Sequence, residues 1–288
     1  MNKKLAALLM CLIMLAALLP VGASADTGPK PSVTVRFSGL GDEPCYATLM
    51  SERESTGPAH VWDGVEGNEQ IIDVGHDIWK AFVDYKDPDG FFFLQEAWQV
   101  NETKEFCWGY YPPDVFKVLL YFPESGRFIS TAILESYAFD SYYSVNASDA
   151  SGGLMPAVED YDTSHEAWGL IARAIITVAT ELGIALLFRY GGKKQLIFLA
   201  AVNVVTQVIL NVIVNSVSFH SGPWAATITL IFGELVVLTV EATAYGLFLN
   251  KLGTRERRNA VAVLYAIVAN TASLVVGRLL MQYLPGIF

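Results

Sequence analysis

Acidic and amide side chains recur inside the most apolar part of this 288-residue sequence. They stand at helical spacing within stretches long enough to cross a membrane, so that they share helix faces. An ionisable group in hydrocarbon is costly, and a pair of carboxylates there would share a proton or hold a cation. The candidate site consists of Glu181, Asn203, Gln207, Asn211, Glu234, Glu241, Asn270 and Arg278.

The expected topology separates these residues into two layers. Glu181, Asn203 and Glu241 fall in the cytoplasmic half of the membrane, without an intramembrane base. Glu234 falls in the outer half, where Arg278 or the arginine of the first helix can neutralise it. Two interpretations stay open: an ion, proton or substrate site, or hydrogen bonds that join helices. Helix joining explains the amides well and Glu241 poorly, since an amide would serve at lower desolvation cost.

No motif of a zinc protease, a serine hydrolase, a dinucleotide-binding enzyme or a P-loop protein occurs, so no enzyme activity or cofactor is predicted. Asp87, Asp89, Gly90 and Glu96 match positions of a calcium-binding loop. Tyr85, however, stands where the first carboxylate is needed, and x-Pro-Asp-Gly is itself a turn signature. We therefore predict a turn and no metal site.

Four apolar segments must position the candidate site, and each is long enough to span the hydrocarbon core. They are Trp168–Phe188, Leu196–Val217, Trp224–Leu249 and Ala260–Tyr283. Basic residues concentrate in the first and third connections, at Arg189–Lys194 and Lys251–Arg258. The positive-inside rule makes these loops cytoplasmic, and it leaves the uncharged connection Ser218–Pro223 outside.

Residues 1–25 are typical of a secretory signal peptide, with two lysines, an apolar run and Ala23-Ser24-Ala25 before Asp26. The alternative is an uncleaved anchor helix. Both the signal and the loop charges predict a multi-pass protein of the cell membrane whose N-terminal domain is extracellular.

Composition agrees with this organisation. The chain is 53% hydrophobic and 17% charged, with a formal net charge of −10. Between Asp26 and His165 stand 24 acidic and 8 basic residues. These values argue against a soluble single-domain enzyme, a disordered protein and a nucleic-acid binder, and they indicate membrane lipid as a partner.

Short alternating segments separated by turns predict a β-domain over residues 26–147. Val33–Phe37 alternates, and Pro123–Gly126 is the turn of a hairpin between Phe116–Phe122 and Arg127–Ile133. This spacing favours an antiparallel β-sandwich of immunoglobulin or transthyretin type. Residues 148–165 are expected to be a linker, and residues 166–288 the four-helix transmembrane domain.

A second hairpin is expected around Asp87–Gly90, between strands at Trp79–Tyr85 and Phe91–Trp98. A short helix near Asp77–Val83 is the alternative for the first of these strands. Cys45 and Cys107 are the only cysteines after the signal, and in an exported domain such a pair predicts a disulfide.

The β-domain is rich in aromatic residues. Exposed aromatic side chains would bind a sugar, a peptide or a protein, whereas buried ones would form the core. The set comprises Trp98, Phe106, Trp108, Tyr110, Tyr111, Tyr137, Phe139, Tyr142 and Tyr143.

The second and third apolar segments carry Asn203-x-x-Thr206-Gln207-x-x-x-Asn211-x-x-x-Asn215 and Glu234-x6-Glu241-x3-Tyr245. This pattern resembles a motif of small, uncharacterised four-helix membrane proteins of anaerobic Gram-positive bacteria that have an exported N-terminal β-domain. The resemblance implies location and architecture only, because that group has no established activity.

Two functions follow as hypotheses. In the first, the outward β-domain binds a ligand or partner protein and a polar-cored bundle anchors it. In the second, the protein is a transporter or channel component that handles a proton or cation at the intramembrane Glu and Asn residues. Small residues at Gly233, Ala242 and Ala244 favour a homo-oligomer.

Overall fold

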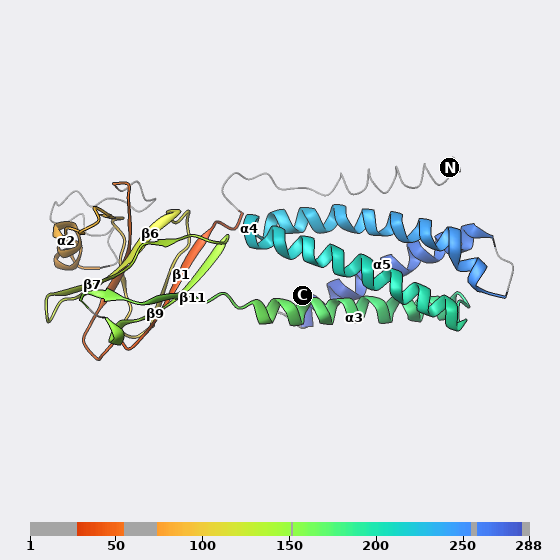
Figure 1. Cartoon of the computed structure of the whole chain (residues 1–288), viewed down its shortest axis with the longest axis horizontal. Helices are drawn as coiled ribbons and strands as arrows, with labels where there is room; N and C mark the ends of the chain where they lie inside the picture. The colour runs from red at the N-terminus through yellow and green to blue at the C-terminus, as the bar shows by residue number, and fades with distance from the viewer. Residues whose placement is uncertain (1–27, 55–73, 151, 255–257, 284–288) are drawn as a thin grey trace. The chain divides into compact units, whose positions relative to one another are not determined.

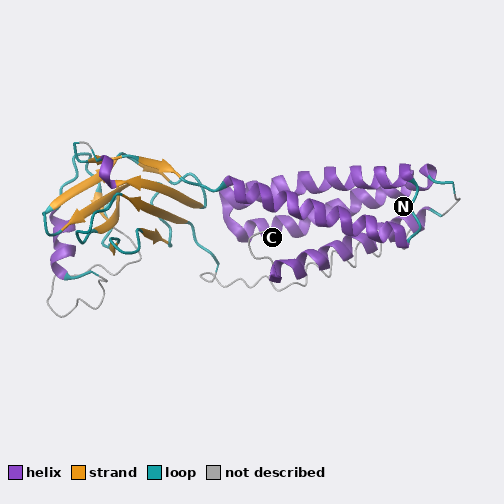
Figure 2. Cartoon of the chain, turned by 90° about the horizontal axis from the view of Figure 1, so that it is seen from below, coloured by secondary structure: helices purple, strands orange, loops and turns teal. Residues whose placement is uncertain are grey.

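The computed structural model describes residues 28–54, 74–150, 152–254 and 258–283. Two compact units divide the chain, one over Lys30–Tyr161 and one that holds the long helices from Asp162 onward. All the strands belong to the first unit (Figure 1, Figure 2). The predicted signal peptide lies outside the described residues.

The strands of the first unit form two sheets. The four-stranded sheet has the order β11-β9-β1-β5, and the seven-stranded sheet has the order β10-β7-β6-β2-β3, with β4 beside β2 and β8 beside β6. The strands are β1 (Ser32–Ser38), β2 (Tyr46–Ser51), β3 (Phe92–Phe93), β4 (Trp98–Gln99), β5 (Glu105–Trp108), β6 (Val115–Phe122), β7 (Arg127–Thr131), β8 (Leu134–Glu135), β9 (Asp140–Asn146), β10 (Leu154–Met155) and β11 (Ala157–Glu159).

Two strand pairs correct the prediction of an all-antiparallel domain. β1 runs parallel to β9, with Ser32 opposite Asp140, and β7 runs parallel to β10. The predicted hairpin is confirmed, because β6 and β7 are antiparallel and meet at Phe122 and Arg127. Whether two strands pair in parallel depends on the path of the chain between them. The alternation of residues within one strand carries no information about that path.

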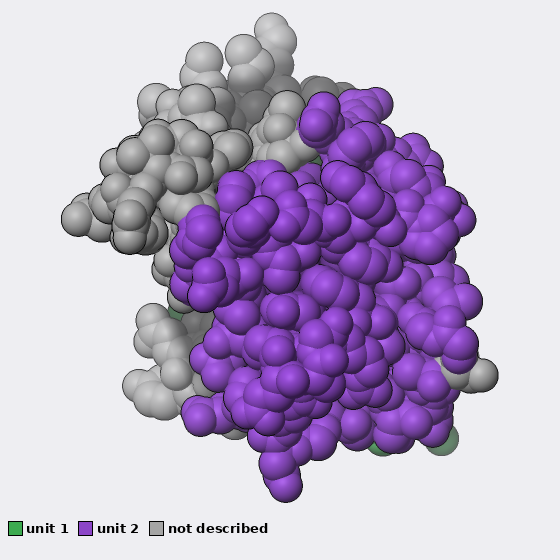
Figure 3. All heavy atoms as spheres, turned by 90° about the vertical axis from the view of Figure 1, so that its left-hand side faces the viewer, with its two compact units in different colours: residues 1–29, 162–288 green, residues 30–161 purple. Residues whose placement is uncertain are grey.

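One hydrophobic core takes side chains from both sheets. β1 and β9 alternate, and each turns every second residue inward, for example Val35 and Tyr143. On the seven-stranded sheet, Phe116, Val118 and Leu120 of β6 join the same cluster. In Figure 3 the described atoms of this unit form one continuous mass (purple).

The opposite face of β6 also lies in a core. Leu119 and Met50 pack there with Phe82 of helix α2 (His76–Asp84). This explains why β6 is buried along nearly its whole length. The strand expected at Trp79–Tyr85 is thus wrong and the helical alternative correct, since apolar residues at 78, 79, 82 and 83 have helical spacing.

The expected linker 148–165 also differs from the structure. A short 3-10 helix, η2 (Ala147–Asp149), leads to β10 and β11, and both strands pair with the sheets. Unit boundaries place Tyr161 with the strands and Asp162 with the helices.

The predicted disulfide is wrong. Cys45 is buried in the core between the sheets, whereas Cys107 is exposed, and both are free thiols. Alternation along β5 causes this, because Phe106 and Trp108 point inward and therefore turn Cys107 outward.

Three helices of the described chain are long and apolar enough to cross a membrane. They are α3 (Thr163–Leu187), α4 (Lys193–Phe248), which continues into the 3-10 helix η3 (Leu249–Leu252), and α5 (Asn259–Tyr283). α4 is interrupted at Gly222, whose φ of 84° and ψ of 174° are not helical, directly before Pro223. Hydrogen bonds between its two halves, such as Asn203 to Tyr245, show that the chain reverses there (Figure 1).

Candidate functional site

The structure gathers four of the predicted polar residues into one buried set. Glu181, Asn203 and Glu241 have 0% exposure and Asn270 has 8%. They come from α3, from both halves of α4 and from α5. Together with two hydroxyl residues that contact them, they form what we call the polar cluster: Glu181, Asn203, Thr206, Glu241, Asn270 and Ser273.

Both carboxyl oxygens of Glu241 have partners. Thr206 Oγ1 lies 2.7 Å from Oε1, and Asn270 Nδ2 donates to Oε2 over 2.7 Å. Thr206 Oγ1 is also 3.1 Å from the carbonyl oxygen of Val202 and 3.0 Å from that of Asn203. A hydroxyl has one proton, so only one of these three acceptors receives it.

Glu181 is less well satisfied. Ser273 Oγ lies 3.5 Å from Oε1, at the limit of a hydrogen bond, and it also donates to the backbone oxygen of Asn270 at 3.0 Å. Glu181 Oε2 has no hydrogen-bond partner among the described residues. The same holds for Asn203 Oδ1 and Asn270 Oδ1. Three buried acceptor oxygens from three helices therefore lack donors with the amide groups oriented as they are, although the Asn203 side chain lies within hydrogen-bonding reach of Glu181.

The two carboxyl groups are close enough for each to act on the other. Asn270 contacts Glu241, and Ser273, one turn further along α5, contacts Glu181. The charge of Glu241 acts on Glu181. No lysine, arginine or histidine of the described residues forms an ion pair with either carboxyl group. Two such groups cannot both stay charged at low cost in an apolar surrounding unless a cation or a proton joins them.

Two buried tyrosines complete the frame of the polar cluster. Asn203 Nδ2 donates to the hydroxyl of Tyr245 at 3.0 Å, and the Tyr265 hydroxyl donates to the backbone oxygen of Glu181 at 3.1 Å. Their rings are 5.6 Å apart. Tyr265 and Ser273 are not among the residues predicted from the sequence. Two features of the sequence point to them: a buried tyrosine hydroxyl needs a hydrogen-bond partner, and Ser273 follows Asn270 by three residues, on the same helix face.

The remaining predicted residues lie outside the polar cluster. Gln207 is buried, and its backbone oxygen accepts a hydrogen bond from Asn211 Nδ2 at 2.8 Å. Glu234 is half-buried on the second half of α4. Arg173 lies 3.5 Å from Asn215, and the side chain of Arg278 is outside the described residues. The predicted outer pairing of Glu234 with an arginine is therefore not resolved.

The donor set of the polar cluster is carboxylate, amide and hydroxyl oxygen. Across the described ranges, no three His, Cys, Asp or Glu side chains gather as a metal site. Oxygen donors of this kind suit hard cations or protons rather than soft transition metals.

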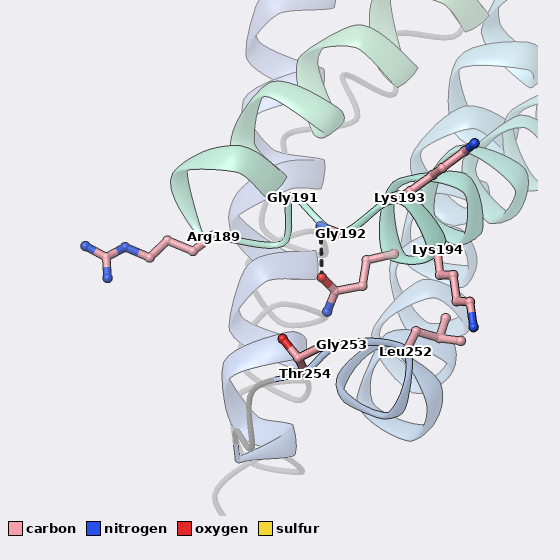
Figure 4. A pocket seen from close by; sticks show the side chains of 9 residues that line it. Arg189, Gly191, Gly192, Lys193, Lys194, Leu252, Gly253 and Thr254 are labelled. Carbon is pink, nitrogen blue, oxygen red and sulfur yellow. Dashed lines mark hydrogen bonds between the residues drawn. The ribbon is translucent and has the colours of Figure 1, made fainter.

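A pocket of about 430 Å³ lies between the two basic connections of the helical unit. The lining residues are Arg189, Gly191, Gly192, Lys193, Lys194, Gln195, Leu252, Gly253 and Thr254. Figure 4 shows the Arg189 and Lys193 side chains directed away from each other, and the Gly192 N–H donating to the Gln195 side chain. Gln195 Nε2 also donates to the backbone oxygen of Leu249 at 3.1 Å. The first and third connections thus lie at the same end of the helices.

Most of the aromatic residues counted in the β-domain are core residues. Phe106, Trp108 and Tyr143 are buried, and Trp98 and Tyr137 pack against the same cluster. Two neighbours differ, since Tyr110 is 40% and Tyr111 58% exposed. The Lys30 ammonium lies 5.9 Å and 5.6 Å from their ring centres.

Comparison with known proteins finds no matching family, curated protein or solved structure. The resemblance to the Gram-positive membrane proteins therefore stays a prediction.

Proposed function

We propose that the helical unit binds a proton or a monovalent cation at the polar cluster, as a transporter or channel component. The supporting observation is that Glu181 Oε2, Asn203 Oδ1 and Asn270 Oδ1 are buried without donors beside a second carboxyl group. Each unsatisfied buried group costs about 1–3 kcal/mol. Polar groups retained only to join helices would be expected to satisfy each other, whereas a cation or a proton-carrying water would satisfy all three.

Thr206 gives Glu241 a matching hydrogen bond in either protonation state. When the hydroxyl donates to Oε1, Glu241 is a carboxylate that also accepts from Asn270. When the hydroxyl donates to its own helix, as threonine commonly does, the 2.7 Å contact requires a proton on the carboxyl group. A residue that exchanges protons benefits from both arrangements, whereas a static joint between helices needs one.

The arrangement in the membrane is part of the same proposal. We count α4 as two crossings that reverse at Gly222, which makes four with α3 and α5. The two basic connections meet at one end of the helices, as a common cytoplasmic side requires. The strand unit is then extracellular, and the core that its two sheets share supports the proposal of a sandwich.

A binding role for the strand unit is the second candidate. The exposed pair Tyr110 and Tyr111 favours it, because adjacent exposed aromatic rings suit contact with a sugar or a peptide. The other aromatic residues that suggested this role mostly lie in the core, so we rank it below the cation site.

The test is thermal unfolding of the full chain in detergent, in sodium, potassium and choline chloride and across pH, for wild type, Glu241→Gln and Glu234→Gln. A cation at a hundred times its Kd stabilises the folded state by about 2.7 kcal/mol. We expect one cation, or acid pH, to raise the Tm of wild type and Glu234→Gln, and this response to disappear in Glu241→Gln. Glu234 is the control for the loss of a buried carboxyl group as such, since it is an intramembrane glutamate that makes no hydrogen bond within the polar cluster, although the charge of Glu241 reaches it.

Equal responses of wild type and Glu241→Gln in every salt and at every pH would assign the polar cluster to helix packing and overturn the proposal. Flux of the stabilising ion into proteoliposomes then distinguishes transport from binding. We expect flux with wild type and Glu234→Gln and none with Glu241→Gln.

A further inference from the structure

A lysine of the strand unit is buried against the two aspartates of the predicted Asp87–Gly90 turn. Lys117 Nζ lies 2.8 Å from Asp87 Oδ1, 3.1 Å from Asp87 Oδ2 and 2.6 Å from Asp89 Oδ2. The side chains of Lys117 and Asp87 are 2% and 0% exposed, whereas that of Asp89 is 56% exposed. Lys117 stands on β6 beside Leu119, on the face covered by α2, and its ammonium lies 5.4 Å from the ring centre of Phe91.

The turn after α2 holds the Asp87 carboxyl group in a fixed orientation. The backbone N–H groups of Asp89 and Phe91 both point to Asp87 Oδ2, at 3.0 Å and 3.3 Å. In this turn the Gly90 N–H donates a hydrogen bond to the Asp87 carbonyl oxygen, and Gly90 has a φ of 81°. Oδ2 therefore faces two N–H donors, and Oδ1 is the oxygen nearest the lysine.

We propose that Lys117 and Asp87 condense to an intramolecular isopeptide bond, with Asp89 as the acid–base group. The lysine first passes one proton to Asp87 Oδ1, which leaves a neutral amine and a carboxylic acid, and Nζ attacks Cγ. As the Cγ–Nζ bond forms, Nζ gives a second proton to Asp89, and Asp89 passes it to the Oδ1 hydroxyl, which leaves as water when the Cγ–Oδ1 bond breaks. The products are one amide and one water molecule, so no oxidant, reductant or activating co-reactant is needed.

Each part of this reaction has a group in place. The two N–H donors on Oδ2 stabilise the negative charge that develops on that oxygen in the tetrahedral intermediate. Holding the amine and the carboxyl group in contact replaces a bimolecular encounter by an intramolecular one, which accelerates bond formation. Asp89 touches the nitrogen and is open to solvent, so water can leave past it.

Lys117 must lose its charge before Nζ can attack. Burial lowers the pKa of Lys117, but hydrogen bonds to Asp87 and Asp89 outweigh it and raise the pKa overall. Lys117 therefore rests mostly in its charged form, and condensation proceeds from its minor neutral form. An amide removes both buried charges, which are costly to desolvate, so the product is favoured by the same surroundings.

The test is peptide mapping by tandem mass spectrometry of the purified full chain, denatured before trypsin digestion. We expect one branched peptide that joins residues 87–104 to residues 105–127, uncleaved after Lys117 and lighter by one water than those two segments as separate peptides. Recovery of linear peptides alone, with cleavage after Lys117, would overturn the proposal.

Two variants make the assignment specific. Asp89→Asn removes the acid–base group and leaves the lysine and Asp87 in place, so the linear peptides should return while circular dichroism stays that of a folded chain. Lys80→Arg is the matched control, because Lys80 and Asp84 form a 2.7 Å ion pair that is exposed at both ends. This variant should keep the branched peptide. A branched peptide retained in Asp89→Asn would contradict the role of Asp89.

Discussion

At the scale of single residues, the two cysteines of the strand unit have opposite surroundings. Cys45 is buried between the sheets, and Cys107 points outward from β5. Burial raises the pKa of Cys45 from 9.0 to about 11, and the nearby charge of Lys104 lowers it only in part. Since thiolate is the reactive form, the folded protein protects one thiol and presents the other.

This difference predicts a pH dependence of stability. The folded state holds the Cys45 proton more tightly than the unfolded chain does, so this contribution is complete below pH 9 and is lost as pH rises toward 11. We expect urea titrations over that interval to show a falling free energy of unfolding, with a shallower fall in Cys45→Ala. An identical fall in both proteins would show that Cys45 does not titrate as its burial requires.

At the scale of elements, the reversal inside α4 is what creates the polar cluster. It brings Thr206 of the first half to Glu241 of the second. Further along, a side chain at Gly233 would overlap Leu210, so the halves approach closely there. Gly233 and the small residues Ala242 and Ala244, which suggested a homo-oligomer, pack within the chain.

We expect Gly222→Ala to destabilise the helical unit by about 1–3 kcal/mol, because its positive φ with ψ near 180° is open essentially only to glycine. Unfolding by denaturant in detergent micelles measures this change. Gly183→Ala is the control, since nothing lies within 4 Å of the added methyl group. Alanine in a helix should there be neutral or stabilising, by up to about 0.5–1 kcal/mol. Equal effects of both substitutions would argue against a strained reversal.

At the scale of the whole molecule, the proposed topology assigns each part of the chain to one side of the membrane. Arg189, Lys193 and Lys194 line a pocket with Leu252–Thr254, so the basic residues of both connections lie at one end. The connection at Ser218–Pro223 is carried by the reversal of α4, at the opposite end of both halves. Only one orientation satisfies the positive-inside rule.

Labelling with a membrane-impermeant maleimide tests that orientation in intact cells. We expect Cys107 of the unmodified protein to react without permeabilisation and without a reductant. A Thr254→Cys variant, with Cys11 and Cys107 changed to serine, should react only after permeabilisation. The reverse pattern would invert the topology, and a reductant requirement for Cys107 would restore the disulfide that the structure rejects.

Features that depend on local pattern could be predicted from the amino-acid sequence. Apolar runs located the long helices, and alternation with Pro123–Gly126 located β6, β7 and their hairpin. Helical spacing also placed Glu181, Asn203 and Glu241 on inward faces. These features follow from hydropathy and from the periodicity of apolar residues, both of which can be read from a short stretch of sequence without knowledge of the rest of the chain.

Contacts between residues distant in the chain became known from the folded structure alone. It paired β9 in parallel with β1 and turned Cys107 away from Cys45. It also joined Asn270 to Glu241 and Lys117 to Asp87. In each case the local sequence would allow either residue several different partners. The two residues lie in contact because the path of the chain between them, through a helix reversal or the pairing of distant strands, brings them together. The chemistry proposed for both units depends on these long-range contacts, which composition and spacing do not encode.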